Sequence, residues 1–204
     1  MIWKTKELKN KKTEEQKNKR TKTIIHEWAE SIIVAFLLAM VIRAFVIQAF
    51  KIPTGSMRPT LMEGDLILVN KFIYGAKVPF TPLKLPALSG PRRGDVIVFI
   101  YPEDRKKDFI KRLVGLPGDN IEIKNGTIYI NDKPLLDPEF NQRYYYNRGD
   151  FADGNQNILV PKDSFFVLGD NSASSRDSRY WGFVPRQNIL GKAMVIYWPP
   201  QRIR

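Results

Sequence analysis

Residues 120–130 read Asn-Ile-Glu-Ile-Lys-Asn-Gly-Thr-Ile-Tyr-Ile, and this stretch is the clearest local indication of the fold. Apolar and polar residues alternate on both sides of the pair Asn125-Gly126. Alternation with a period of two is typical of a half-buried strand. An Asn-Gly pair between two such runs is the strongest short-range signal for a two-residue turn. The stretch therefore predicts an antiparallel β-hairpin.

Other runs with the composition of strands lie on both sides of this hairpin. They are Leu66–Val69, Asp95–Tyr101, Phe165–Leu168 and Gly191–Trp198. Each run is bounded by Gly, Asp or Pro, and no long helical period follows residue 50. Many short strands with Gly/Pro turns favour an antiparallel β-barrel or a folded sheet, so we expect a mainly β fold. Residues 74–91 and 134–157 are rich in loop-forming residues and are predicted as irregular insertions.

The composition limits the possible chemistry. The chain has 204 residues, 43% of them hydrophobic, which is sufficient for a buried core. It has no cysteine, so disulfides and thiolate nucleophiles are excluded. The single histidine, His26, lies at the edge of an apolar segment, and a Ser-His-Asp triad or a histidine metal site is therefore not expected. A hydrolase with this sequence needs another base, and we expect no metal or cofactor.

The longest apolar segment covers residues 28–50 and is interrupted by Glu30, Arg43 and Gln48. A membrane-spanning helix needs about 20 mostly apolar residues, and charged residues cost less near its ends than at its centre. We therefore expect one transmembrane helix over residues 28–50. The alternatives are a cleavable signal peptide, with residues 32–40 as its apolar region, and a buried amphipathic helix.

The tail before this segment predicts the orientation. Residues 1–22 carry nine Lys/Arg and three Glu, which is +6 of the net charge of +12. Because Lys/Arg-rich flanks remain cytoplasmic, we expect residues 1–27 in the cytoplasm and residues 51–204 on the outer face of the membrane. The remaining part of the chain is only mildly basic. The lipid bilayer is therefore an expected partner, and nucleic acid is not.

Residues 53–61 read Pro-Thr-Gly-Ser-Met-Arg-Pro-Thr-Leu and place Ser56 in a loop between the apolar segment and the first predicted strand. The two prolines restrict φ, and Gly55 allows backbone angles that other residues avoid. A loop of defined shape can present a nucleophile. Taken alone, however, a Gly-Ser pair in a loop is more often an ordinary loop serine.

A second block contains a lysine in an apolar setting. Lys111 follows Phe109 and Ile110, and its neighbour Arg112 is expected on the opposite side of the strand. If Lys111 points into an apolar face, burial lowers its pKa, and a neutral lysine is a competent general base. The alternative is a lysine that faces water. A third block, residues 168–179, is rich in short hydrogen-bonding side chains that can orient a base, or can form a solvated turn.

Together these blocks resemble bacterial type I signal peptidases, which are membrane-bound Ser/Lys proteases of the S26 class. The matching motifs, in order, are residues 53–61, Arg93–Phe99, residues 109–119 and residues 169–179, after a basic tail and an apolar helix. The resemblance implies that Ser56 is the nucleophile and that Lys111 is the general base. It also implies an oxyanion hole formed by the Ser56 N–H and the Thr54 hydroxyl.

The same resemblance implies supporting and substrate-binding residues. Ser175 is expected to hold the lysine, and Asp177 and Arg179 to form a supporting ion pair. The apolar residues that resemble the lining of the family's shallow pockets are Ile52, Met57, Leu61, Phe109 and Ile110. Such pockets accept small residues before the cut. A second subdomain is expected around residues 132–160, reduced in comparison with the larger family members.

The implied function is removal of signal peptides from secreted preproteins at the bacterial cytoplasmic membrane. A self-cleaving repressor relative uses the same Ser/Lys chemistry, but it needs a DNA-binding domain, and the basic tail is too short for one. A membrane-anchored β domain that binds partners without catalysis is the alternative from another class. That alternative predicts an exposed, charged Lys111.

Overall fold

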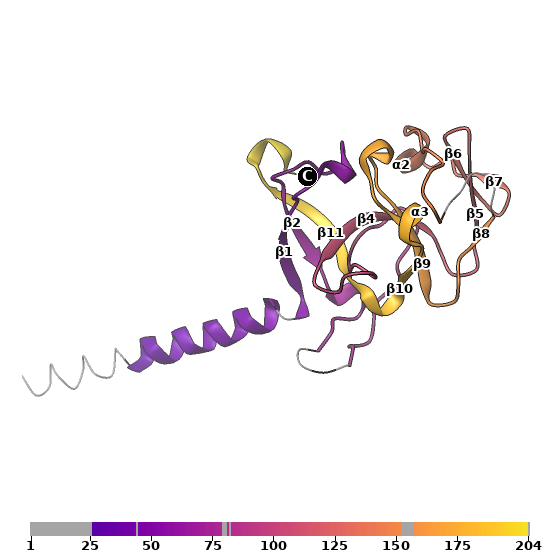
Figure 1. Cartoon of the computed structure of the whole chain (residues 1–204). Coiled ribbons are helices and arrows are strands. Elements are labelled where there is room, and N and C mark those ends of the chain that lie inside the picture. The colour runs from indigo at the N-terminus through magenta and orange to yellow at the C-terminus, as the bar shows by residue number, and fades with distance from the viewer. Residues whose placement is uncertain (1–25, 44, 79–80, 82, 152–156, 204) are drawn as a thin grey trace, which may run out of the picture. The chain divides into compact units, whose positions relative to one another are not determined.

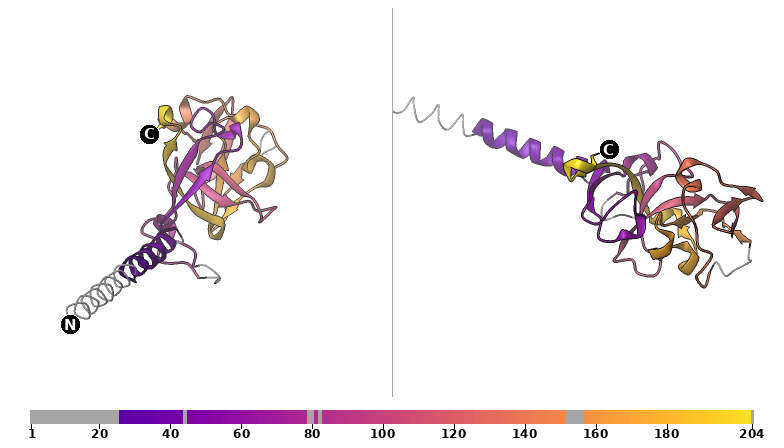
Figure 2. Two further views of the ribbon diagram at one scale, coloured as in Figure 1. Left: turned by 90° about the vertical axis from the view of Figure 1, so that its left-hand side faces the viewer. Right: turned by 90° about the horizontal axis from the view of Figure 1, so that it is seen from above.

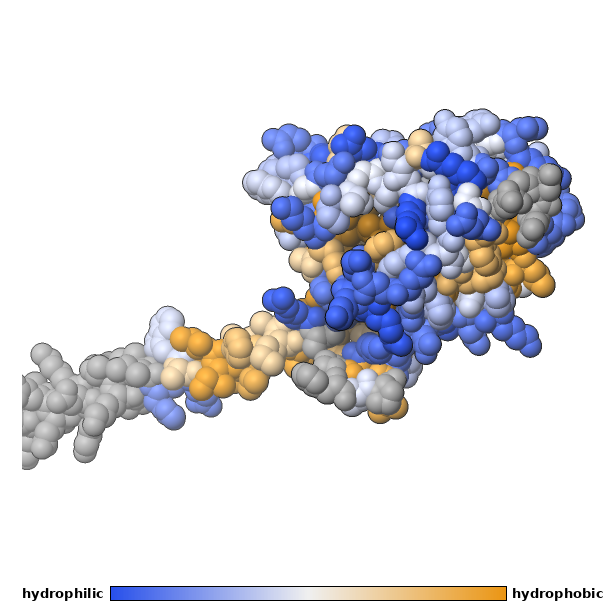
Figure 3. Space-filling view, in the orientation of Figure 1, coloured by the Kyte–Doolittle hydropathy of each residue, from blue (hydrophilic) through white to orange (hydrophobic). Residues whose placement is uncertain are grey.

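The computed structural model describes residues 26–43, 45–78, 81, 83–151 and 157–203. The chain divides into two compact units, Met1–Arg43 and Ala44–Arg204. In the first unit residues 26–43 are helical, and Figure 3 shows apolar side chains along much of this helix. Most of the predicted basic tail, residues 1–25, lies outside the described residues. Within the described ranges, no helix combines the length and the apolar character that a membrane crossing requires.

The second unit consists of strands joined by loops and single-turn helices (Figure 1). Its strands are β1 (Ile47–Lys51), β2 (Leu66–Asn70), β3 (Val96–Ile100), β4 (Asp108–Gly115), β5 (Asn120–Lys124), β6 (Thr127–Ile130), β7 (Lys133–Pro134), β8 (Ile158–Leu159), β9 (Ser164–Leu168), β10 (Val184–Pro185) and β11 (Ile189–Trp198). Its short helices are η1 (Gly55–Met57), η2 (Phe72–Tyr74), α2 (Pro138–Asn141), η3 (Ser172–Ser174), α3 (Ser178–Trp181), η4 (Arg186–Asn188) and η5 (Pro200–Arg202).

The described strands form two antiparallel sheets, which Figures 1 and 2 show from three directions. The larger sheet has the order β1-β2-β11-β3-β4-β9-β10, and the smaller one has the order β7-β6-β5-β8. The predicted mainly β, antiparallel fold is confirmed. Because β1 and β10 are the outer strands of the larger sheet in the described residues, this sheet is open, which agrees with a folded sheet and not with a closed barrel.

The predicted hairpin is present. Strands β5 and β6 pair from Ile121 with Ile130 to Lys124 with Thr127. Both turn residues have positive φ, 49° at Asn125 and 80° at Gly126, as a two-residue hairpin turn of this kind requires. The four other predicted runs correspond to β2, β3, β9 and β11, with ends that differ by one or two residues.

One predicted boundary differs from the structure. Residues 47–50, assigned above to the membrane segment, belong to β1, which pairs along its length with β2. An apolar run is compatible with a helix and with a strand, and a partner distant in the sequence decides between them. The predicted second subdomain around residues 132–160 contains β7 and β8 of the smaller sheet, whose first strand begins at Asn120, and the subdomain stays a prediction.

Two buried clusters support the segments that meet at the site. One cluster lies behind η1 and includes Ile52, Met57 and Leu61 together with Val98 of β3. The other joins the smaller sheet to β9 and consists mainly of residues of β5, β6 and the following loop, packed on Phe166 and Leu168. The turn that carries Ser56 and the end of β9 therefore both rest on buried apolar side chains.

Candidate active site

Ser56 lies in the single-turn helix η1, between β1 and β2. Its neighbour Met57 is fully buried in the core, and the Leu61 N–H donates to the Met57 carbonyl over 2.9 Å. These contacts hold the turn against the buried core. Ser56 itself is 7% exposed, so its side chain is held at the inner edge of a cleft.

Lys111 comes from β4, whose residues 108–112 pair with β3. Its Nζ atom donates to the Ser56 Oγ atom over 2.7 Å and to the Ile110 carbonyl over 3.0 Å. The same Nζ atom lies 5.6 Å from the centre of the Phe109 ring. Lys111 is 4% exposed, so the alternative of a lysine that faces water is wrong for this structure.

The surroundings of Lys111 change its proton affinity. Burial is the main cause and lowers the pKa of the amine to about 8, from an ordinary value of 10.5. The carboxylates of Asp177 and Asp170 act in the opposite direction, and Arg179 lowers the pKa further. An amine with this pKa is neutral in about a tenth of the molecules at pH 7 and in about half of them at pH 8. It can therefore accept the proton of a neighbouring hydroxyl.

The loop after β9 approaches Ser56 closely at Gly169. A Cβ atom at Gly169 would lie 2.1 Å from the Ser175 Oγ atom and 2.6 Å from the Ser56 carbonyl oxygen. Only glycine fits this contact. Ser175 is buried, and its hydroxyl makes no hydrogen bond within the described residues. The expected hydrogen bond from Ser175 to Lys111 is thus not formed here, and its orienting role stays a prediction.

Asn171 is a further contact of the nucleophile turn that the sequence reasoning missed. Its backbone N–H donates to the Ser56 carbonyl over 3.0 Å, and its side-chain Nδ2 donates to the Gly55 carbonyl over 3.1 Å. Both bonds span more than 100 residues of sequence. The only local signal was its place in a block rich in short polar side chains.

Asp177 and Arg179 form a fully buried salt bridge. Arg179 Nε and Nη2 each lie 2.8 Å from a carboxylate oxygen of Asp177. Asp177 also accepts the Gly169 N–H over 3.0 Å, and Arg179 donates to the Ser172 hydroxyl and the Tyr146 carbonyl, both over 2.7 Å. The pair therefore links the two ends of the loop after β9 and connects this loop to the segment that follows α2.

A second buried ion pair lies on the other side of β4. Arg112 donates from Nε and Nη2 to the two carboxylate oxygens of Asp170, over 2.7 and 2.6 Å. Arg143 lies 3.4 Å from the same carboxylate, and Thr60 donates to it. Arg112 thus points away from Lys111, as alternation along a strand requires, but it is buried and paired. The sequence did not indicate this network.

A cleft of about 250 Å³ opens above the pair Ser56 and Lys111. The residues that line it are Pro53, Thr54, Ser56, Asp108, Phe109, Ile110, Lys111, Ser174 and Arg176. Thr54 is exposed at its rim in an extended conformation. A smaller hollow of about 40 Å³ shares Phe109 and Ile110 with the cleft and adds Ile52 to its walls.

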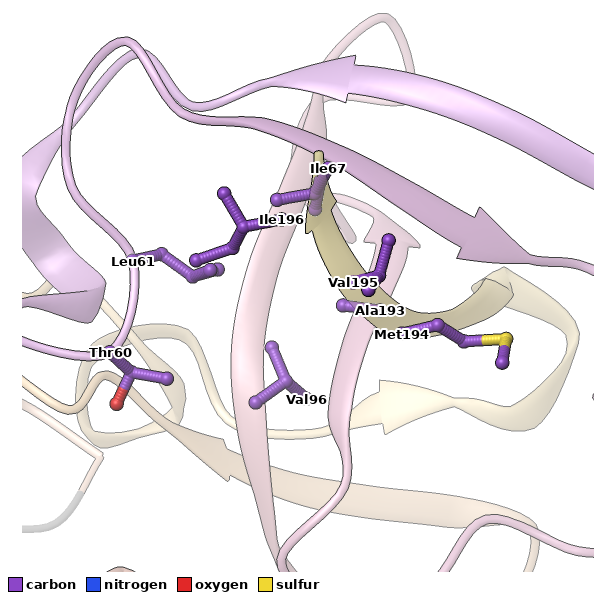
Figure 4. A pocket seen from close by; sticks show the side chains of 8 residues that line it. All are labelled: Thr60, Leu61, Ile67, Val96, Ala193, Met194, Val195 and Ile196. Carbon is purple, nitrogen blue, oxygen red and sulfur yellow. The ribbon is translucent and has the colours of Figure 1, made fainter. Parts of the chain in front are cut away.

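Two residues expected in the substrate pockets lie elsewhere. Met57 is fully buried and packs in the core. Leu61 lines a separate pocket of about 230 Å³, where Figure 4 shows it facing Val96 and Ile196. Both residues follow Ser56 closely in the sequence, but the turn directs them into the sheet. Their assignment to the substrate site rested on the resemblance to the family's pocket lining, and a motif does not determine the direction of a side chain.

The described residues offer no group of three or more His, Cys, Asp or Glu side chains arranged to hold a metal ion. The chemistry that the cleft can perform with its own groups is proton transfer between Lys111 and Ser56, with attack of the resulting oxygen nucleophile on a bound carbonyl.

Comparisons with known proteins identify the family of this chain. The chain matches the sequence model of the family described as signal peptidase, peptidase S26, over residues 25–198. It is 41% identical over 184 residues to a signal peptidase I from Leptolyngbya laminosa, covering 87% of this chain and 81% of that protein. It is 34% identical over 214 residues to a signal peptidase I from Pseudomonas aeruginosa, and the match covers 88% of this chain and 75% of that protein. It is 33% identical over 189 residues to a signal peptidase IB from Staphylococcus aureus, and the match covers 87% of this chain and 92% of that protein. The chain therefore belongs to the signal peptidase family, peptidase S26.

Proposed function

We propose that this protein is a serine endopeptidase that removes signal peptides from exported preproteins by a Ser/Lys mechanism. The observation that carries the proposal is the buried contact of 2.7 Å between Lys111 Nζ and Ser56 Oγ at the floor of the cleft. Membership of the family supports the choice of substrate. The low exposure of Lys111 argues against a domain that only binds partners.

The mechanism follows from the positions of the groups. Neutral Lys111 takes the proton of the Ser56 hydroxyl while Oγ attacks the scissile carbonyl carbon. The Ser56 N–H and the Thr54 hydroxyl donate to the developing oxyanion, and one such donor is often worth about 3 to 4 kcal/mol. The ammonium of Lys111 then protonates the leaving amine as the peptide bond breaks. Water attacks the ester with Lys111 again as base, which releases the signal peptide and restores Ser56.

Substrate recognition is assigned to the apolar part of the cleft. Ile52, Phe109 and Ile110 line the two hollows beside Ser56 and provide shallow apolar walls for small side chains before the cut. An extended peptide would add to the backbone that borders the cleft.

We assign the orientation of the base to the loop after β9. Ser175 contacts Gly169, which in turn lies against the Ser56 carbonyl, and the Ser175 hydroxyl has no hydrogen-bond partner among the described residues. The buried pair of Asp177 and Arg179 holds the shape of this loop. Ser175→Ala is expected to lower kcat with little change in KM. A Ser175→Ala enzyme with unchanged kcat removes Ser175 from this role.

The proposal includes an anchor in the bacterial cytoplasmic membrane, formed by the apolar segment before β1, with the basic tail in the cytoplasm and the catalytic unit outside. The charge of the tail and the apolar surface of the helix over residues 26–43 support it. We expect the protein to remain in the membrane pellet after alkaline carbonate extraction, with its catalytic unit accessible to external protease. Release into the supernatant would contradict the anchor.

The test of the activity is cleavage of a preprotein with Ala at the first and third positions before the cut. Ser56→Ala and Lys111→Arg should both abolish cleavage, since a guanidinium stays protonated at any working pH. Lys107→Arg is the matched control, because Lys107 is exposed and pairs with Asp104 at the surface. Near wild-type turnover of Lys111→Arg would refute the mechanism.

A further inference from the structure

A third charged side chain reaches the buried ion pair of Arg112 and Asp170, and it comes from the segment after α2. This side chain is Arg143, which lies between β7 and β8 in the sequence. Its Nη2 atom donates to the Thr60 hydroxyl over 3.1 Å and lies 3.4 Å from a carboxylate oxygen of Asp170. The Arg143 side chain is 17% exposed, so these contacts are largely shielded from water.

The backbone around Arg143 is held in place by the core of the smaller sheet. Phe140 and Tyr145, on either side of Arg143 in the sequence, are both buried in that core. The Arg143 N–H donates to the Phe140 carbonyl over 3.1 Å, and the Tyr145 N–H donates to the Gly126 carbonyl over 3.0 Å. The Nη1 atom of Arg143 also donates to the Glu139 carbonyl. Because the backbone is fixed by these bonds, less conformational entropy opposes the contacts of the guanidinium.

The two partners of Arg143 belong to segments that carry or contact Ser56. Thr60 lies four residues after Ser56 in the same loop, and its hydroxyl donates to Asp170. Asp170 is followed directly by Asn171, whose backbone N–H donates to the Ser56 carbonyl over 3.0 Å. Arg143 therefore joins, at one point, the two segments whose relative position determines where the Ser56 hydroxyl lies.

Arg143 also changes the charge that Lys111 faces. The charged groups that act on the amine are Asp177, Asp170 and Arg179, and the cleft in front of it is also lined by Asp108 and Arg176. Asp170 raises the pKa of Lys111, and Arg143 is a second arginine beside this carboxylate, after Arg112. A positive charge beside a carboxylate weakens the effect of that carboxylate on a third group. Arg143 therefore allows the amine to lose its proton at a lower pH.

We propose that Arg143 is a positioning residue for the reaction, which holds Thr60 and Asp170 together from the segment after α2. Through Thr60 it fixes the turn of Ser56, and through Asp170 it sets the charge that Lys111 faces. This inference rests on the proposed function and adds a residue to it. Arg143 acts through its partners, because the cleft is lined by other residues of the described chain. The segment after α2 is then required for catalysis and not only for the stability of the smaller sheet.

The experiment compares wild type, Arg143→Gln and Arg143→Lys over a pH series, using the full chain in detergent micelles and the preprotein described above. Glutamine removes the charge, whereas lysine keeps the charge without the planar fork that reaches two partners. Rates are expressed per folded molecule, with the folded fraction taken from urea unfolding. Arg105→Gln, at an exposed position, is the matched control.

The two variants should separate charge from position. Arg143→Gln should lower kcat on the high-pH plateau about fivefold to tenfold, with KM within about twofold of the wild type. It should also move the midpoint of the rising kcat/KM profile upward by about 0.5 pH unit, because Asp170 then acts on Lys111 with less compensation. Arg143→Lys should keep the wild-type midpoint and lower the plateau kcat about threefold.

Several results would overturn the inference. An Arg143→Gln enzyme with the wild-type kcat, or with a lower kcat and an unmoved midpoint, overturns it, since the second result is what a purely structural role gives. A higher KM at unchanged kcat overturns it as well, because Arg143 would then act on substrate binding. If Arg143→Gln does not fold, Arg143→Lys decides, and a folded lysine variant with the wild-type plateau kcat overturns the inference.

A second substrate separates this inference from the proposed function. A small activated ester acylates Ser56 through the same proton transfer to Lys111 but needs no signal peptide. Absence of preprotein cleavage by the wild type would contradict the proposed function. The pH profiles of ester hydrolysis by wild type and Arg143→Gln would then still decide the role of Arg143, and identical profiles would overturn it.

Discussion

Replacement of Lys111 by methionine should stabilise the fold while removing the base. Methionine keeps an unbranched side chain of similar length but carries no charge. Folding brings Lys111 from water, where its pKa is about 10.5, to a buried position where its pKa is about 8. Between these two values the unfolded chain binds more protons at this group than the folded chain. The stability of the wild type must therefore rise with pH across this window.

The size of the effect follows from the difference of about 2.5 in pKa. With 1.36 kcal/mol for each pKa unit, the depressed pKa costs the folded wild type about 3 kcal/mol at pH 7, about 2 kcal/mol at pH 9 and less than about 1 kcal/mol at pH 10.5. The variant Lys111→Met has no titrating group at this position and therefore does not carry this cost. Its lost hydrogen bond to Ser56 and altered packing contribute a term that does not depend on pH.

The assay is urea unfolding of wild type and Lys111→Met in the same detergent at these three pH values. All other titrating groups are common to the two proteins, so they cancel in the difference. The wild type should gain about 3 kcal/mol relative to Lys111→Met between pH 7 and pH 10.5. A difference that stays constant over this range would mean that the pKa of Lys111 is not depressed by folding, and the argument for a neutral base would fail.

Three further predictions concern the same site. The kcat/KM of the wild type should rise about tenfold from pH 7 to pH 9, as the neutral fraction of the lysine grows from about a tenth to about nine-tenths, and a flat profile would contradict this. Gly169→Ala should reduce kcat strongly because its Cβ displaces the loop from Ser56, with near-normal turnover as the contrary result. Arg112→Met should destabilise the protein by about 3 to 5 kcal/mol, since Asp170 is left buried with its main partner removed, whereas Arg105→Met at an exposed position should have little effect in the same unfolding assay.

Much of the fold was predictable because it depends on short-range patterns. The hairpin around Asn125-Gly126 and the strands β2, β3, β9 and β11 are visible in residues that are neighbours in the sequence. Strand β1 was not predicted, because its residues continue an apolar segment without a break and only pairing with β2 distinguishes them.

The site was predictable in part. Ser56 and Lys111 were chosen from their motifs, and the structure places their side chains in contact although 55 residues separate them. Met57 and Leu61 were assigned to the substrate pockets from the family resemblance and point elsewhere. Asn171, Arg112 and Asp170 were missed, because their roles consist of bonds to distant segments.

The sequence by itself determined the antiparallel β class, the hairpin and the small set of polar side chains that can perform chemistry, since these depend on alternation, turn residues and the absence of cysteine and of a usable histidine. Tertiary structure alone decided that Lys111 is buried rather than solvated, and that it meets Ser56. It also decided that Asp170 is neutralised by Arg112, whereas the pair of Asp177 and Arg179 was already implied by the family resemblance. The physical reason is that burial and charge pairing arise from segments brought together by sheet formation, and the desolvation that lowers the pKa of Lys111 exists only once those segments have packed.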